Sequence, residues 1–314
     1  MNSAHPNVVV VIVNYRTGEL VVNCLESLKK ILGESVKVIV VDNCSGDSSV
    51  DLIGKWVCDN QNASLVCSEI NTGFSGGNNL AIRYAKDQGF LADYVWLLNP
   101  DTVVRDDALQ NLVSFMQQNP KVGIAGSRLE DLDGTAQCSA FRFHTVLSEL
   151  DNGLKLGVVS KLLQNWLVAL PISDTPACVD WVAGASMLIR DRVFDDIGLF
   201  DEEYFLYFEE TDFCLQAKKA GWSCWYVPTS RVVHFAGSST GVTNKTKKRR
   251  PRYWFESRRR YFLKNHGLFY LFAANCFWAL AFSLFRIRQV IQNKADDGPS
   301  CLLRDFVSFN FFNK

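Results

Sequence analysis

The stretch VVVVIVNY at residues 8–15 is an apolar, β-branched run that ends in two polar side chains. VKVIVVDN at residues 36–43 has the same form. Runs this short and this continuously apolar are typical of strands covered on both faces, as in a parallel sheet. Amphipathic stretches lie between them, which predicts an α/β domain whose mostly parallel sheet is flanked by helices. Further strands are expected at 63–69, 94–101, 122–129, 179–189, 224–228 and 232–237, and helices at 19–32, 76–89 and 106–118.

Charge divides the chain near residue 244. Residues 1–244 contain 18 basic and 29 acidic residues, whereas residues 245–314 contain 15 and 4, so the formal net charge of zero combines an acidic body with a basic tail. We predict one large domain over 1–244 and a basic and apolar helical region over 245–314. Residues 130–178 lack a clear pattern and are expected to form a variable insertion, with a helix at 158–169. A basic tail favours contact with the phosphates of lipid or nucleic acid.

The basic tail continues into an apolar stretch. Residues 245–264 contain ten basic residues and one acid, and LFYLFAANCFWALAFSLF at 268–285 has 18 residues without a charge. As a helix, this stretch would span roughly 27 Å, slightly less than the ~30 Å hydrocarbon core of a bilayer. Three interpretations stay open: a helix in or against the cytoplasmic leaflet, which we favour, a true span, or an ordinary buried helix.

Three further patterns limit the class of protein. Ten cysteines occur without a C-x-x-C pair, which favours reduced thiols over disulfides or a zinc site. The first residues have no basic leader and lead directly into a strand, so we expect a cytoplasmic protein. TGFSGG at 72–77 is not the G-x-G-x-x-G dinucleotide fingerprint, and G-x-x-x-x-G-K-S/T does not occur. A Rossmann dehydrogenase or a P-loop ATPase is therefore not expected.

Polar side chains follow four of the predicted strands. Each group alone is more readily explained as part of a turn. In open parallel sheets, however, ligands bind beyond the carboxyl ends of the strands, so the four groups together predict a binding site at one edge. The groups are Asn14-Tyr15-Arg16, Asp42-Asn43, Asn71-Thr72-Gly73-Phe74 and Asn99-Pro100-Asp101.

An acidic segment, FLYFEETDFCLQ at 205–216, sets Glu209, Glu210 and Asp212 among aromatic residues. One explanation is a helix start, because acids favour the positive end of the helix dipole. The other is chemical, because a carboxylate among aromatic rings is poorly solvated. Poor solvation raises its pKa towards values useful for proton abstraction. The segment by itself leaves both explanations open.

Seven stretches occur in order along the chain: VVIVNYRT (10–17), VVDNCSGDSS (40–49), NTGFSGGNNLAI (71–82), LLNPDTVV (97–104), WVAGASMLIRDRVF (181–194), FDEEYFLYFEETDFCLQAKKAGW (200–222) and VVHFAGSS (232–239). Together they resemble glycosyltransferase family 2, which has the GT-A fold, over about residues 7–267. The subgroup most similar in appearance is that of the bacterial rhamnosyltransferases of polysaccharide assembly. The resemblance implies an inverting transfer of a sugar from a nucleotide diphosphate, without a covalent glycosyl-enzyme.

The resemblance also implies where the sugar donor binds. Asp42 would contact the base or ribose of the nucleotide, and Asn14 and Arg16 would lie near the same moiety. The residues expected to bind the donor are Asn14, Arg16, Asp42, Asn43, Gly73, Phe74 and Asn99.

A divalent metal, Mg²⁺ or Mn²⁺, is implied on the donor diphosphate. Asp101 stands at the second acid of the family's Asp-x-Asp motif, and Asn99 replaces the first. A neutral amide oxygen is a poorer ligand for a hard cation than a carboxylate, so metal affinity is reduced or other groups contribute. His234 matches a family histidine that can complete the metal shell. The alternative is a buried or capping histidine, because imidazole suits Mn²⁺ better than Mg²⁺.

Glu209 and Glu210 occupy the family's Glu-Asp position, in which the second carboxylate is the catalytic base. That base would be Glu210 here, one methylene longer than the aspartate it replaces, with Asp212 as the alternative. Glu209 and Asp212 are three residues apart, so they would share a helix face and serve acceptor binding or local structure.

The expected partners follow from the resemblance and the basic tail. dTDP-rhamnose is the first choice of donor, with UDP- and GDP-sugars behind it. The acceptor is expected to be a saccharide, carried on a lipid diphosphate if the tail meets the cytoplasmic surface of the inner membrane. Nucleic acid is not expected, because the aromatic residues of the tail run on into an apolar helix. Two alternatives stay open: a sugar nucleotidyltransferase, and a non-catalytic membrane-associated protein that binds nucleotide-sugars.

Overall fold

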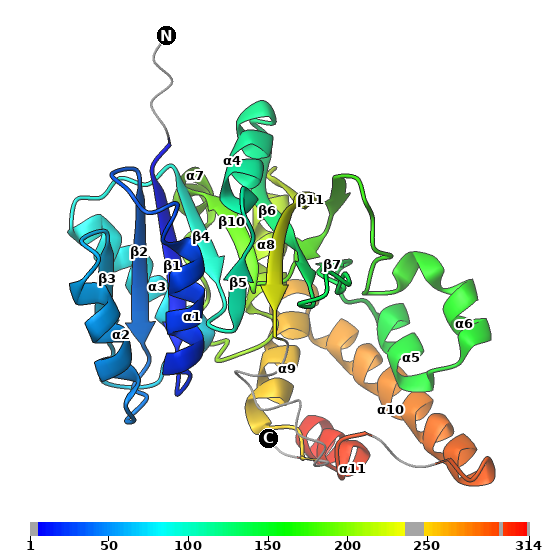
Figure 1. The fold of residues 1–314 in the computed structure, drawn as a ribbon. Helices are drawn as coiled ribbons and strands as arrows, with labels where there is room; N and C mark the ends of the chain where they lie inside the picture. Colours follow the sequence, from blue (N-terminus) through cyan, green and yellow to red (C-terminus); the bar gives the residue numbers. More distant parts are fainter. Residues whose placement is uncertain (1–5, 236–247, 295–297, 313–314) are drawn as a thin grey trace. The chain divides into compact units, whose positions relative to one another are not determined.

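A computed structural model describes residues 6–235, 248–294 and 298–312 (Figure 1). The chain divides into two compact units, each considered as far as these residues describe it. The first unit comprises residues 1–141, 171–205 and 209–243, and the second 142–170, 206–208 and 244–314.

The observed units can be compared with the predicted domains. Residues 142–170, expected within a variable insertion of the first domain, belong to the second unit. The predicted boundary at residue 244 lies outside the described residues, as do residues 236–237 of the last predicted strand and 245–247 of the basic run.

A nine-stranded sheet forms the middle of the first unit. Its order is β3 (Ala63–Cys67), β2 (Val36–Asp42), β1 (Val8–Asn14), β4 (Tyr94–Leu98), β10 (Ser186–Arg190), β6 (Val122–Glu130), β11 (Ser223–His234) and β5 (Thr102–Val104), with β8 (Ala177–Val179) beside β11. A separate ribbon pairs β7 (Ala140–Phe141) with β9 (Trp181–Val182). β1 is parallel to β2 and β4, β2 to β3, and β6 to β11, whereas β10 is antiparallel to β4 and β6. The predicted mostly parallel sheet is confirmed.

Helices cover both faces of this sheet (Figure 1). Val10 of the first strand lies in a buried cluster with Leu25 and Leu112 from two of these helices. On the opposite face, a Cβ added to Gly77 would lie 2.6 Å from the Val13 side chain. Successive side chains of a strand point to opposite faces, so the continuous apolar run of β1 serves both helical layers. The helices are α1 (Gly18–Leu28), α2 (Ser49–Cys58), α3 (Gly73–Asp87), α4 (Ala108–Gln118), α7 (Asp191–Ile197) and α8 (Glu209–Lys219).

Three elements differ from the sequence-based expectation. The stretch 179–189, expected as one strand, is instead divided among the end of β8, β9 and β10. The stretches 224–228 and 232–237 instead begin and end one strand, β11, which shifts register against β6 between Val227 and Arg231. Such an irregularity lets a strand include Pro228, which has no N–H to donate. The helix expected at 158–169 is α6 (Gly157–Leu162) followed by a 3-10 turn (Gln164–Trp166).

Buried polar groups join the helices of the second unit. Arg258 donates hydrogen bonds to Glu149 at 2.7 Å and to Asn275 at 2.6 Å. Burial alone would raise the pKa of Glu149. The charge of Arg258, the adjacent His144 and the hydrogen bonds that Arg258 donates lower it instead. Removing one partner of such a pair leaves a buried charge, so the pair fixes which helices meet. This unit contains α5 (Val146–Leu154), α6, α9 (Arg252–His266), α10 (Leu268–Ile291), α11 (Leu302–Val307) and a short π-helix, η2 (Ser308–Phe312).

Helix α10 has two different apolar faces. Among the described residues it is the helix long and apolar enough to cross a membrane, with a mean hydropathy of 1.8 over its best 18-residue window, of which 33% is buried. Leu271, Trp278 and Phe282 are buried. Phe269 and Leu280 are 91% and 68% exposed. The helix extends six residues beyond the uncharged stretch, from 286 to 291.

Candidate functional site

Strand direction places the predicted polar groups at one edge of the sheet. β1, β2, β3 and β4 are parallel, and β6 and β11 point the same way because antiparallel β10 separates them from β4. Asn14, Asp42 and His234 end their strands, and Asn99 and Asp101 directly follow β4. The start of β10 lies at this edge too, since Ser186 is opposite Leu98. The candidate site therefore lies beyond the carboxyl ends of the parallel strands.

Asn14 and Asp42 bond to each other at the ends of β1 and β2. Asn14 Nδ2 donates to Asp42 Oδ1 at 2.7 Å, and both residues are buried. Ser45 donates to Asp42 through its N–H at 3.0 Å and its hydroxyl at 2.5 Å. Arg16, which has φ 60°, bonds to Ser45 through its own N–H and its Nε, each at 2.9 Å. The four side chains thus form one network, and the role of Asp42, Asn14 and Arg16 towards a nucleotide stays a prediction.

Asn43 positions the loop between β3 and α3. Its side-chain N–H groups donate to Asn71 Oδ1 at 3.0 Å and to Gly73 O at 2.9 Å. Its Oδ1 accepts from the N–H of Thr72 at 3.0 Å and from the Thr72 hydroxyl at 3.2 Å. These four bonds use the ordinary hydrogen-bonding capacity of the amide. Asn43, predicted to bind the donor, therefore acts here on the chain's own backbone.

Gly73 and Phe74 bring this loop to the segment before α8. Gly73 has φ 70°, and a Cβ built on it would lie 2.0 Å from the Phe205 carbonyl oxygen, which accepts a bond from the Phe74 N–H at 2.8 Å. A Cβ at Gly184 would lie 3.2 Å from the Phe74 ring and 3.9 Å from Glu210 Oε1. Phe74 and Glu210 therefore meet the same glycine, at the start of β10.

Asp101 and His234 are adjacent, as predicted for metal ligands. His234 pairs with Thr102 in the antiparallel register of β11 and β5, and its Nε2 lies 3.6 Å from the buried Asp101 Oδ1. Its Nδ1 is 3.3 Å from Gln137 Oε1, which fixes the ring orientation. Donor atoms this close can share one divalent ion, and the half-buried Asn99 lies two residues from Asp101. The described residues contain no group of three or more His, Cys, Asp or Glu that could hold a metal. Asp101 and His234 are thus two residues that could hold a divalent ion, and their role as metal ligands stays a prediction.

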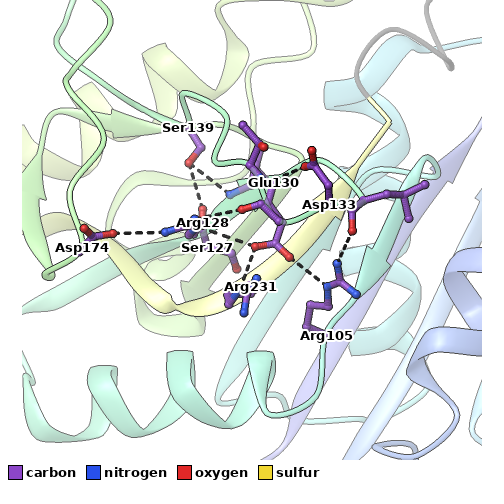
Figure 2. A network of polar contacts seen from close by, with 12 residues as sticks. Arg105, Ser127, Arg128, Glu130, Asp133, Ser139, Asp174 and Arg231 are labelled. Carbon is purple, nitrogen blue, oxygen red and sulfur yellow. Dashed lines mark hydrogen bonds and ion pairs between the residues drawn. The ribbon is translucent and has the colours of Figure 1, made fainter.

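A buried carboxylate supports the edge that carries this pair (Figure 2). Glu130 accepts hydrogen bonds from Arg105 Nε at 3.0 Å and Arg231 Nε at 2.8 Å. Burial alone would raise the pKa of Glu130, but the hydrogen bonds from the two arginines lower it. Glu130 pairs with Val233, the neighbour of His234. These ion pairs tie β6 to β11 and to the end of β5, and so hold the histidine in place.

The acidic segment begins α8, and its carboxylates have unequal surroundings. Burial raises the pKa of Glu209 well above its usual value, and the charge of Glu210 raises it further. Burial also raises the pKa of Glu210, against a lowering by backbone N–H groups that include that of Gly184. Asp212 is buried and accepts a bond from Gln216 at 3.1 Å. Both predicted explanations hold in part: the acids start a helix, and Glu210 lies at the site edge with a raised pKa.

Sequence reasoning missed three residues that shape this site. Ser45 and Gln137 orient Asp42 and His234, and Gly184 lies against Glu210. Ser45 and Gly184 lie inside stretches that carry the family resemblance, so that resemblance could have marked them. Gln137 lies in a stretch without a recognisable pattern, and only the fold brings it to His234.

Comparison with known proteins decides the family. The model of glycosyl transferase family 2 matches residues 9–161, and that of glycosyl transferase family group 2 matches residues 94–292, more than half of the chain. The chain belongs to glycosyltransferase family 2. It is 30% identical to the rhamnosyltransferase WbbL of Escherichia coli (strain K12) over 231 residues, 73% of this chain and 83% of that protein. This glycosyltransferase is also 30% identical, over 244 residues, to the N-acetylglucosaminyl-diphospho-decaprenol L-rhamnosyltransferase of Mycobacterium tuberculosis (strain CDC 1551 / Oshkosh), covering 74% of this chain and 77% of the relative.

A solved structure agrees with the fold of this glycosyltransferase. The mannosyltransferase PcManGT of Pyrobaculum calidifontis, in complex with GDP-Man and Mn²⁺, superposes with a TM-score of 0.57 at 14% identity, covering 99% of this chain and 82% of that one. At this identity the likeness concerns the fold alone. The predicted GT-A fold is confirmed.

Proposed function

We propose that this glycosyltransferase moves rhamnose from dTDP-rhamnose, with inversion, to a hydroxyl group of a saccharide acceptor in surface polysaccharide assembly. The sugar is supported by the similarity to two rhamnosyltransferases at 30% identity. The reaction rests on one observation above all: Glu210, whose pKa is raised, lies against Gly184 at the edge where the strands end. A carboxylate in that position can accept a proton from a hydroxyl group.

The proposed reaction is a single displacement. Glu210 takes the proton of the acceptor hydroxyl while that oxygen forms a bond to the anomeric carbon from the face opposite the nucleotide. The bond from the anomeric carbon to the donor diphosphate oxygen breaks, and its electron pair leaves with the nucleoside diphosphate. A poorly solvated carboxylate with a raised pKa holds the proton better than an ordinary glutamate, which is the property a base needs here.

Asp101 and His234 are the residues that we propose for holding a divalent ion. A bound Mg²⁺ or Mn²⁺ would supply positive charge to the departing diphosphate. The donor set fits Mn²⁺ better than Mg²⁺, because imidazole is an ordinary ligand for the softer of these two ions. With Asn99 in place of a carboxylate, the protein contributes less negative charge, so the metal affinity of the free enzyme should be low.

The acceptor that we propose is a saccharide linked to a lipid diphosphate, used at the cytoplasmic surface of the inner membrane. The mycobacterial relative is named for such a substrate, N-acetylglucosaminyl-diphospho-decaprenol. The exposed apolar face of α10 and the basic residues of α9 support a membrane surface as partner, because apolar and cationic groups add to each other there.

The assignment of Glu210 can be tested by changing it to glutamine, which keeps the shape and removes the base. We expect Glu210→Gln to lower the transfer rate by about 10²- to 10⁴-fold, the usual contribution of a general base, with donor binding retained. Rate and donor affinity are measured separately, by transfer assay and by thermal shift with dTDP-rhamnose.

The control is Glu203→Gln, which removes an exposed carboxylate in the loop before α8 and should leave both quantities unchanged. Near-normal turnover of Glu210→Gln would contradict the assignment. Wild-type protein that binds the donor and transfers nothing, with or without Mn²⁺, would instead favour a non-catalytic binding protein.

A further inference from the structure

The second unit contains a basic hollow that takes no part in the site described above. Its volume is about 310 Å³, and three arginines, Arg249, Arg250 and Arg252, line it together with one acid, Asp305. Ser308 adds a hydroxyl group. Three guanidinium groups against one carboxylate leave an excess of positive charge, as in a site for an anion.

Each of the three arginines has a different interaction partner within the chain. Arg249 binds Asp305, with Nε 2.7 Å from Oδ2, and hydrogen bonds from Arg249 lower the pKa of Asp305. Arg252 pairs with Glu256 across one helical turn, but their side chains are 82% and 47% exposed. An exposed pair of this kind contributes little and can exchange its partner. Arg252 is thus available to a stronger anion.

The face of the Arg250 guanidinium packs over the Trp254 ring. Its guanidinium carbon lies 5.3 Å from the centroid of the Trp254 ring. Stacking of this kind leaves the N–H groups at the rim of the guanidinium free to donate in its plane, which suits the oxygens of a phosphate. Within the described residues Arg250 forms no ion pair with a carboxylate. Together with Arg252 it provides two forks for a multiply charged group.

Aromatic side chains also line the hollow. Phe255 and Phe309 line the hollow, with ring centroids 5.6 Å apart. On the same short helix as Phe309 lies Phe311, which contacts Phe272 of α10 at 6.2 Å. Phe272 and Phe311 are 59% and 38% exposed. An apolar path of exposed rings therefore begins beside the cationic hollow, which is the pattern that an amphiphile with an anionic head requires.

We propose that this hollow binds the diphosphate of a lipid carrier, with Arg250 and Arg252 on the phosphate oxygens and the prenyl-type chain along Phe309, Phe311 and Phe272. The proposal rests on the proposed function, because it names the part of the chain that holds the lipid diphosphate of the acceptor. A diphosphate fits better than the head of a phospholipid, since the Arg250 fork and the exposed, exchangeable Arg252 fork match several anionic oxygens, whereas a phosphodiester carries one charge.

Binding of farnesyl diphosphate to the full chain tests this proposal. Calorimetry is done with dTDP in excess, so that the nucleotide site does not contribute. We expect Arg250→Gln/Arg252→Gln to weaken binding at least tenfold, because both substitutions remove charged hydrogen bonds to the phosphate oxygens. Arg192→Gln, which removes an exposed arginine on α7 in the first unit, should leave the affinity unchanged.

Three further ligands show which parts of the amphiphile the hollow recognises. Farnesol and inorganic pyrophosphate should each bind at least tenfold more weakly than farnesyl diphosphate, since each lacks one half of the amphiphile. Short-chain phosphatidylglycerol should also bind at least tenfold more weakly. Equal affinity for phosphatidylglycerol would overturn the proposal in favour of a bilayer phospholipid, and equal affinity for pyrophosphate would overturn the apolar path.

The same variants separate this proposal from the proposed function. Thermal shift with dTDP-rhamnose reports on the nucleotide site and should be the same for wild type and for Arg250→Gln/Arg252→Gln. If no nucleotide-sugar stabilises the wild type, the proposed function fails, whatever farnesyl diphosphate does. If nucleotide-sugar binding is normal and the double variant keeps its affinity for farnesyl diphosphate, the hollow is not the lipid site.

Discussion

Glu209 and Glu210 are neighbours in the chain with different surroundings. Glu209 is 4% exposed, and in the described part of the chain neither its Oε2 nor that of Glu210 has a hydrogen-bond partner. Glu210 is half-buried and meets the N–H of Gly184. Two carboxylates this close cannot both ionise at ordinary cost, because each charge disfavours the other. The charge of Glu210 thus adds to burial in raising the pKa of Glu209, while Glu210 itself reaches the site edge.

The raised pKa of Glu209 makes a prediction about stability and pH. A carboxyl group with a raised pKa in the folded state contributes stability below its unfolded pKa, near 4.5, and that stability is lost as the pH rises through the folded value. We expect Glu209→Gln to raise the free energy of unfolding at pH 8 by about 1 kcal/mol or more, since one pKa unit corresponds to about 1.4 kcal/mol. Urea denaturation measures this difference against wild type.

The gain from Glu209→Gln should shrink as the pH falls towards 4.5. Glu203→Gln, at an exposed position, should change stability by less than about 0.5 kcal/mol at every pH. A stability difference for Glu209→Gln that does not vary with pH would show that charge is not the cause.

At the scale of elements, the start of α3 depends on a close approach of two backbones. Gly73 has φ 70° and packs against the carbonyl of Phe205, which leads towards α8. Asn43 holds the same loop from β2. The contact joins the glycine-rich loop to the acidic segment, and no side chain larger than hydrogen fits between them.

Replacing Gly73 by alanine should therefore cost more than backbone strain alone. Gly89 is a matched control, because it has φ 73° and an added Cβ there would meet no atom within 4 Å. We expect Gly73→Ala to lower the free energy of unfolding by about 1–3 kcal/mol more than Gly89→Ala. Urea denaturation measures the difference, and donor binding should weaken for Gly73→Ala alone. Equal losses at the two sites would mean that the Phe205 contact contributes nothing.

At the scale of the whole molecule, α10 presents an apolar stripe. Six of its exposed apolar residues lie three, four or eight positions apart along the helix, so they share one face. A stripe of this length on a helix that is buried along its other face is typical of a surface that contacts a membrane or a partner. The stripe consists of Phe269, Phe272, Leu280, Leu284, Ile287 and Ile291.

If this stripe enters the membrane interface, polar residues in it should release the protein from vesicles. We expect Leu280→Ser/Leu284→Ser to reduce binding to vesicles containing phosphatidylglycerol at least tenfold, because burying one leucine contributes about 1.5–3 kcal/mol. Co-sedimentation measures binding, and circular dichroism checks the fold. Leu162→Ser changes a leucine of α6 that is 78% exposed, and its binding should match wild type. Unchanged binding of the double variant would exclude the stripe as the membrane contact.

The sequence by itself determined the class of sheet and most of its strands. The runs 8–15 and 36–43 are apolar on both faces, and a backbone with such side chains has few alternatives to a covered parallel strand. It also determined that polar groups gather where those strands end, since parallel strands share one edge.

Tertiary structure decided what each polar group does there. Asn43 resembles Asn14 in its position after a strand, yet its side-chain amide bonds to the loop at 71–73. Gln137 contacts His234, which lies 97 residues away in the chain. It also decided that residues 142–170 pack in the second unit and that one face of α10 is left exposed. Hydrogen-bond partners and burial depend on which distant segments of the chain meet. The local sequence pattern does not specify those contacts.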